Sequence, residues 1–242
     1  MTPLAHSDDL SRKSRVAELL YLAIIVTDLG ADIRLRRMLI DFPDANATAA
    51  AILSAPGQFR LAVAAGVVMA LSDARLAILL HLIFRKMAPG LALSAMVFRL
   101  IQALLIAASI LALLAAWLVL TRDGLSDAPV LASVFLDLHE YGCDLGLVIS
   151  GVNSLIMGVL VWRSGLVAKA FVAGLGIAGP VCLAGSGMRF FAPELLPIFL
   201  PAYGLTFLAE TAFCLRLLLL NWPAKHDAHR VSSGSQQLGD NQ

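Results

Sequence analysis

Residues 100–120 read LIQALLIAASILALLAAWLVL, an apolar run without one formal charge. A helix needs ~20 mostly apolar residues to cross the ~30 Å hydrocarbon layer of a bilayer, so this run predicts a transmembrane helix. Residues 145–162 and 170–188 are uncharged as well. The chain is 59% apolar and 14% charged, whereas about a quarter of the residues in a soluble domain are charged. The composition therefore argues against a water-soluble core.

Hydropathy along the chain predicts six transmembrane helices, near 16–34, 61–85, 97–120, 131–162, 168–188 and 197–221. We expect an all-α polytopic membrane helix bundle over residues 15–222, between a polar N-terminal tail (1–14) and a disordered C-terminal tail (223–242). Asp44 precedes a helix-prone run, 47–53, and Pro56-Gly57 ends it. This pattern predicts a short external helix between the first two spans.

The distribution of Lys and Arg predicts the orientation. Nine of them fall on the side of the two termini and six on the opposite side, and the richer side is usually cytoplasmic. We expect a multi-pass protein of the bacterial inner (plasma) membrane with both termini in the cytoplasm. The net charge of +1 and the scattered basic residues give no support for nucleic acid as a partner.

Three charges are predicted near the middle of the bilayer: Asp73 and Arg75 in the second helix and Glu210 in the last. A charge at that depth costs at least ~2.5–3.5 kcal/mol, so it normally faces the bundle interior and has a partner. Asp73 and Arg75 are two positions apart and point to different faces. We expect Asp73 to find a polar partner on another helix, and we expect Glu210 to pair with Arg75, as a structural ion pair or as part of a functional site.

The third helix carries one polar stripe, formed by Arg99, Gln102 and Ser109 at helical spacing. Arg99 is predicted near the inner surface, where its long side chain can reach the headgroups. A ligand contact is the alternative for Arg99.

The fourth helix holds the densest group of polar residues, within DLHEYGCD at 137–144. Its predicted length exceeds one crossing, so we expect the surplus to project outward and to carry Asp137 and His139 with it, leaving Asp144 just inside the boundary. These three side chains are predicted at the outer mouth of a polar cavity. A solvated helix extension explains them about as well.

Small residues are spaced for close helix packing. Gly142 and Gly146 form one such pair, and a similar series runs along the fifth helix. Packing within the bundle is the simpler interpretation, and a homodimer through these Gly-rich faces is the alternative. The three cysteines, Cys143, Cys182 and Cys214, lack metal-ligand spacing and are interpreted as packing residues.

Several short motifs recur together along the chain. They are Arg15-Val-Ala-x-x-x-Tyr21-Leu, Phe59-Arg60-Leu, Asp73, Phe98-Arg99-Leu-x-Gln102, Leu136-Asp137-Leu-His139-x-Tyr141-Gly142-x-x-x-Gly146-Leu, Trp162-Arg163-Ser-Gly165 and Glu210. With them the chain resembles the bacterial DUF4386 family of integral membrane proteins across nearly residues 15–221. The resemblance implies a six-helix membrane fold and no particular activity. Arg75, Glu140 and Asp144 depart from the family pattern.

Three functions compete. The first is binding or transport of a small molecule or ion, including a cationic ligand, through a polar cavity between helices. Its candidate residues are Asp73, Arg99, Gln102, Asp137, His139, Asp144 and Glu210. The second is a non-catalytic sensor or assembly subunit. The third is a membrane-embedded enzyme or redox protein that uses His81 or His139. Because no catalytic or multi-His signature is present, a non-enzymatic function is favoured, and no metal or cofactor is predicted.

Overall fold

The computed structural model describes residues 16–17, 19–27, 44–164, 169–199, 201–204, 206, 208 and 211. Within these ranges every regular element is helical and no strand occurs. The predicted tails at 1–14 and 223–242 lie outside the described residues, as do Glu210 and Cys214. The all-α prediction is therefore confirmed for the described part of the chain.

Among the described residues, three helices have the length and apolar composition to cross a membrane: α3 (Pro56–Phe84), α4 (Pro89–Leu120) and α5 (Ala128–Ser164). Their 29, 32 and 37 residues correspond to about 43, 48 and 55 Å at 1.5 Å per residue. All three are longer than a ~30 Å hydrocarbon layer requires. A crossing would therefore leave each of them extending beyond that layer at one end or both.

Shorter helices complete the described part. They are α2 (Ala45–Ser54), α6 (Lys169–Phe191) and the 3-10 turn η1 (Pro193–Leu195). Residues 19–27, 196–199 and 201–204 are also helical. Helical residues thus occur in each of the six predicted ranges.

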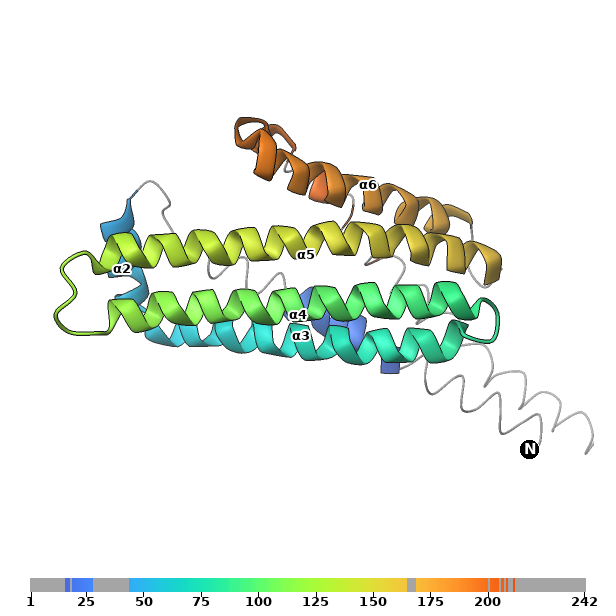
Figure 1. The fold of residues 1–242 in the computed structure, drawn as a ribbon, viewed down its shortest axis with the longest axis horizontal. Coiled ribbons are helices and arrows are strands. Elements are labelled where there is room, and N and C mark those ends of the chain that lie inside the picture. The colour runs from blue at the N-terminus through green and yellow to red at the C-terminus, as the bar shows by residue number, and fades with distance from the viewer. Residues whose placement is uncertain are drawn as a thin grey trace, which may run out of the picture.

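The helices α3 to α6 lie side by side in chain order, and each runs antiparallel to the next (Figure 1). The α3–α4 turn and the end of α5 lie at one end of the bundle, and the α4–α5 turn lies at the other (Figure 1). Gly124 in the α4–α5 turn has φ +86°, which a residue without Cβ adopts at little cost. The turns are short, so residues at equal distances from a turn lie level on the two helices.

The N-terminal ends of α3 and α4 differ from the sequence prediction. The hydropathy windows began at 61 and 97, whereas α3 begins at Pro56 and α4 at Pro89. Proline suits the first turn of a helix because its missing N–H has no intrahelical partner there. Pro56 therefore does more than end α2: it opens the next helix.

A short helix, α2, precedes α3 and packs against α3 and α5. Its predicted place outside the membrane stays a prediction. Asp44 caps it, because its Oδ1 accepts hydrogen bonds from the backbone N–H of Asn46 (2.9 Å) and Ala47 (3.0 Å). Ile52 is fully buried in an apolar cluster with Phe59, Leu113 and Leu136. This cluster joins α2 to one end of α3, α4 and α5.

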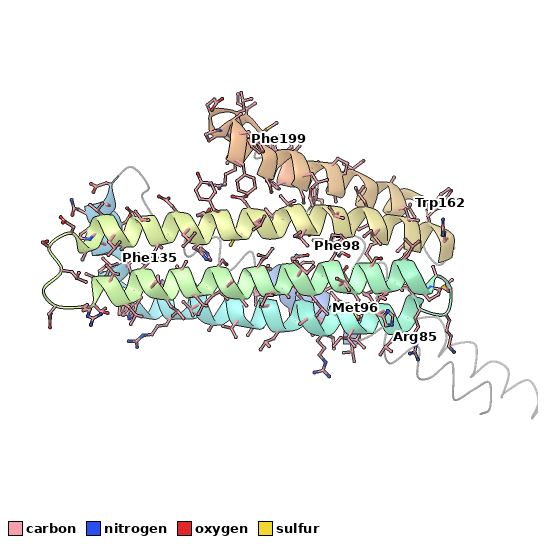
Figure 2. All side chains as sticks on the ribbon, in the orientation of Figure 1. Arg85, Met96, Phe98, Phe135, Trp162 and Phe199 are labelled. Atoms are coloured by element: carbon pink, nitrogen blue, oxygen red, sulfur yellow. The ribbon has the colours of Figure 1, made fainter. Side chains whose placement is uncertain are left out.

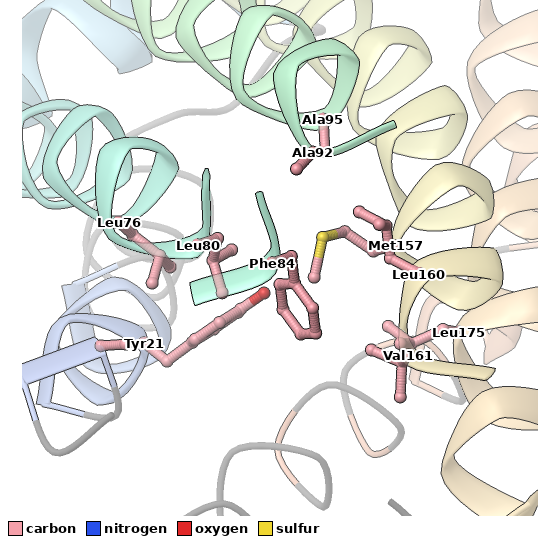
Figure 3. Close-up of a cluster of buried hydrophobic side chains, with 11 residues drawn as sticks. Tyr21, Leu76, Leu80, Phe84, Ala92, Ala95, Met157, Leu160, Val161 and Leu175 are labelled. Carbon is pink, nitrogen blue, oxygen red and sulfur yellow. The ribbon is translucent and has the colours of Figure 1, made fainter. Parts of the chain in front are cut away.

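A second apolar cluster lies near the opposite end of the bundle, where Tyr21 of the first helix meets α3, α4 and α5 (Figure 3). Leu76, Leu80, Ala95 and Leu160 are buried in it. The two clusters hold the ends of the bundle together, and the polar residues described next lie between them.

Candidate functional site

A buried ion pair joins α3 to α4 between the two apolar clusters. Arg99 Nε donates to Asp73 Oδ1 at 2.9 Å, and the two residues are 8% and 0% exposed. Arg99 Nη1 donates to the Tyr21 hydroxyl at 3.0 Å, and its guanidinium carbon lies 4.8 Å from the centre of the Tyr21 ring. Two hydrogen bonds and a cation–π contact thus link three helices through the guanidinium of Arg99.

The prediction that Asp73 faces the interior with a polar partner on another helix is confirmed. The prediction that Arg99 reaches the inner surface is wrong, because α4 begins at Pro89 rather than at 97. Arg99 therefore lies about 15 Å from the start of its helix. Arg75 is exposed, and its predicted pairing with Glu210 stays a prediction because Glu210 lies outside the described residues.

Three buried oxygen atoms near this ion pair have no hydrogen-bond partner among the described residues: Asp73 Oδ2, Gln102 Oε1 and Asn153 Oδ1. Gln102 lies one turn beyond Arg99 on α4. Asn153 and Ala95 are equally far from Gly124 in the sequence, one after it and one before it, so they lie level on α5 and α4. The residues that carry these three oxygen atoms therefore fall within about 10 Å along the bundle axis. Tyr21, Asp73, Arg99, Gln102 and Asn153 are called the mid-bundle cluster below.

A second group of charges joins α5 to α6 and is called the acidic cluster here. Arg189 Nη2 donates to Glu140 Oε2 at 3.4 Å, and Arg189 Nε contacts Asp144 Oδ2. Both carboxylates are buried. The Tyr203 hydroxyl, from the segment after η1, packs directly over Gly185 of α6, about one helical turn from Arg189.

The candidate residues of α5 are separated around the helix and along it. Asp144 faces α6 through Arg189, while His139 faces α4, where its Nδ1 lies 3.0 Å from the Ser109 carbonyl oxygen. Asp137 is exposed. It lies on the same face of α5 as Asp144, about 10 Å nearer to the start of the helix. This position is beyond the level at which α6 ends, at Phe191. The three residues therefore do not converge on one mouth.

Several residues of these clusters were missed by the sequence analysis: Tyr21, Asn153 and Arg189. The sequence did contain a signal for Arg189. Residues 166–167 lie between α5 and α6, and Asp144 and Arg189 are equally distant from them in the sequence, one before and one after. The same symmetry relates Asp73 and Arg99, which are equally distant from Lys86 in the sequence. Antiparallel neighbours joined by a short connection bring such residues to one level.

The small-residue pattern is used inside the chain. A Cβ on Gly142 would lie 2.8 Å from Ser109 Cβ of α4. Ala178 and Cys182 of α6 are buried. At these positions the close spacing serves packing between neighbouring helices of one chain.

Together, the helix lengths, the apolar surfaces and the buried charged residues define the described part of the chain as a helical membrane protein. Residues 16–220 match the family model DUF4386, a domain of unknown function. The chain belongs to the DUF4386 family, as the motifs in its sequence indicated. Comparisons with curated proteins and with solved structures found no significant match.

Proposed function

We propose that the protein is a six-span protein of the bacterial inner membrane, with both termini in the cytoplasm, that binds and carries a small cation or hydrogen-bond-donating molecule through the mid-bundle cluster. One observation carries the proposal. Asp73 Oδ2, Gln102 Oε1 and Asn153 Oδ1 are buried acceptors without a donor among the described residues. Buried polar groups are nearly always satisfied, so three exceptions within about 10 Å along the bundle axis support a donor or a cation in this region.

The chemistry of the acceptors selects the ligand class. All three atoms are oxygens, and one belongs to a carboxylate whose other oxygen is held by Arg99. Such atoms accept hydrogen bonds from ammonium or hydroxyl groups, and they also suit a small hard cation. An anion would meet the same oxygens unfavourably. The middle of the bilayer is also where secondary transporters hold their substrates.

The acidic cluster also favours a cationic ligand over an anionic one. Asp144 lies about 30 Å and Glu140 about 36 Å from the end of α5 at Ser164, at and just beyond the far edge of the hydrocarbon layer if that end lies at the inner surface. Because its two carboxylates share one guanidinium, that of Arg189, the acidic cluster keeps a net negative charge that would meet an entering cation before it reached the mid-bundle cluster. Entry at this end is part of the proposal.

Ligand-dependent stabilisation of the purified full chain tests the proposal. We expect the unfolding midpoint to rise in one of ammonium, methylammonium, sodium or potassium chloride, compared at equal ionic strength. A ligand at 100 times its Kd stabilises a protein by about 2.7 kcal/mol. Gln102→Leu and Asn153→Leu should each reduce the gain, and Asp137→Asn, at an exposed position on α5, should keep it.

The contrary result is equally distinct. If all four salts act alike, or if Gln102→Leu and Asn153→Leu respond as the wild type does, the mid-bundle cluster is not a cation site. A sensor or assembly subunit without a small ligand would then be favoured.

A further inference from the structure

A cysteine, a histidine and a serine meet where α4 packs on α5. Cys143 Sγ lies 3.9 Å from His139 Nε2 and 3.6 Å from Ser109 Oγ. His139 and Cys143 are one helical turn apart and share one face of α5. Ser109 and His139 are equally distant from Gly124 in the sequence, so the antiparallel arrangement brings them level. The three residues, called the thiol site here, are separate from the mid-bundle cluster.

The hydrogen bond of His139 fixes which ring nitrogen carries the proton. His139 Nδ1 lies 3.0 Å from the Ser109 carbonyl oxygen. A carbonyl oxygen only accepts hydrogen bonds, so Nδ1 must be the donor. In the neutral ring the lone pair is then on Nε2, the nitrogen that faces Cys143. His139 is thus positioned to take the thiol proton, as the base does in Cys–His pairs.

Ser109 can support the thiolate that this transfer produces. Its hydroxyl donates to the Ile106 carbonyl at 2.8 Å, an acceptor that the backbone of α4 also satisfies. Rotation of the hydroxyl toward Cys143 therefore costs little. A thiolate at this position would accept hydrogen bonds from His139 Nε2–H and from the Ser109 hydroxyl, and both favour the charged sulfur.

The charged groups nearby act in both directions. Glu140 and Asp144 flank Cys143 on α5 and disfavour another negative charge. Arg189 engages both carboxylates from α6 and offsets part of that effect. Cys143 is partly exposed, whereas Cys182 is buried. This partial exposure is the route by which we expect a small reagent to reach the thiol site in the folded protein.

We propose that Cys143 is a nucleophilic thiol, activated by His139 and Ser109, that undergoes thiol–disulfide exchange with a small disulfide. The thiol proton passes to His139 Nε2 as the sulfur attacks one sulfur of the disulfide. A new S–S bond forms to Cys143, and the S–S bond of the reagent breaks. The leaving thiolate takes the proton from the imidazolium, so one thiol is consumed and one is released.

The test uses the full-length protein in detergent and bis(2-hydroxyethyl) disulfide, which is small and uncharged. Peptide mass spectrometry follows the mixed disulfide at Cys143 over time at pH 7. Because an ordinary thiol is only about 3% ionised at that pH, we expect the wild type to react at least about tenfold faster than His139→Gln. Glutamine keeps an N–H donor for the Ser109 carbonyl. Ser109→Ala should react at an intermediate rate.

Two controls keep the outcome clear. Asp137→Asn removes a charge on the exposed part of α5 and should react as the wild type does. A second measurement needs no variant at the thiol site: Cys143 in the folded wild type should react faster than free glutathione at the same pH. Equal rates in the wild type and His139→Gln, or a Cys143 that reacts no faster than glutathione, would overturn the proposal.

Discussion

The pairing of Asp73 with Arg99 shows how a single residue can be accommodated inside an apolar bundle. Removing a carboxylate from water costs several kcal/mol, and the cost is offset when a partner is held at hydrogen-bond distance. Arg99 supplies one donor to Asp73 and another to Tyr21. The pair therefore specifies how α3, α4 and the first helix meet, even where its net contribution to stability is small.

A double-mutant comparison tests this arrangement. Asp73→Leu leaves the Arg99 guanidinium buried without its carboxylate, and we expect a loss of about 3–5 kcal/mol in the free energy of unfolding. Arg99→Leu should cost a similar amount. The double variant should recover much of the loss, because no uncompensated charge remains. Reversible unfolding in mixed micelles measures the free energy of unfolding of the two single variants and the double variant. If the losses of the single variants simply add in the double variant, the two residues do not form a direct pair.

At the scale of helices, the close contact of α5 with α6 depends on two glycines. Gly151 and Gly179 are equally distant from Gly165 in the sequence and therefore lie level. A Cβ on Gly151 would lie 2.9 Å from the Gly179 carbonyl oxygen, and a Cβ on Gly179 would lie 2.9 Å from that of Gly151. Backbone atoms cannot move aside as a flexible side chain can, so the helices would have to separate. Close packing here positions Arg189 opposite the carboxylates of α5.

Alanine substitutions within one helix separate packing from helix propensity. We expect Gly179→Ala to destabilise the protein by about 1–3 kcal/mol through overpacking. Gly176→Ala, one turn away, meets no atom within 4 Å and should be neutral or stabilise by up to about 1 kcal/mol. Unfolding midpoints of the two variants provide the comparison. A similar effect at both positions would show that contact with α5 is not responsible.

The sequence predicted how far along its helix each charged residue lies better than it predicted which neighbouring helix the side chain faces. Hydropathy and helical rise were sufficient to predict Asp73 as buried and paired. They did not identify Arg99 as its partner, because the start of α4 was predicted about two turns late and Arg99 seemed close to an end. Which side of α5 faces α4 and which faces α6 follows from packing, so His139 and Asp144 could not be separated beforehand. Equal distance from a turn is the sequence signal that would have found both the Asp73–Arg99 pair and the Asp144–Arg189 pair.

At the scale of the molecule, the arrangement of the turns constrains the orientation in a membrane. Arg85 and Trp162 lie at one end of the bundle, and Phe135 lies toward the other (Figure 2). The basic residues Arg85, Lys86 and Arg163 therefore share an end, as the predicted topology requires. Only α4 separates the α3–α4 turn from the α4–α5 turn.

Labelling of single cysteines from one side of the membrane tests the crossing and its direction. In a background with Cys143, Cys182 and Cys214 replaced by serine, Met87→Cys and Ser126→Cys place thiols in the two exposed turns that flank α4. Because basic residues are retained in the cytoplasm, we expect a membrane-impermeant maleimide to label Ser126→Cys in intact spheroplasts and Met87→Cys only after lysis. The reverse pattern would show that the predicted orientation is inverted. Cations that pass the acidic cluster would then enter from the cytoplasm. Labelling of both from one side would mean that α4, the most apolar of the three long helices, does not cross the membrane at all.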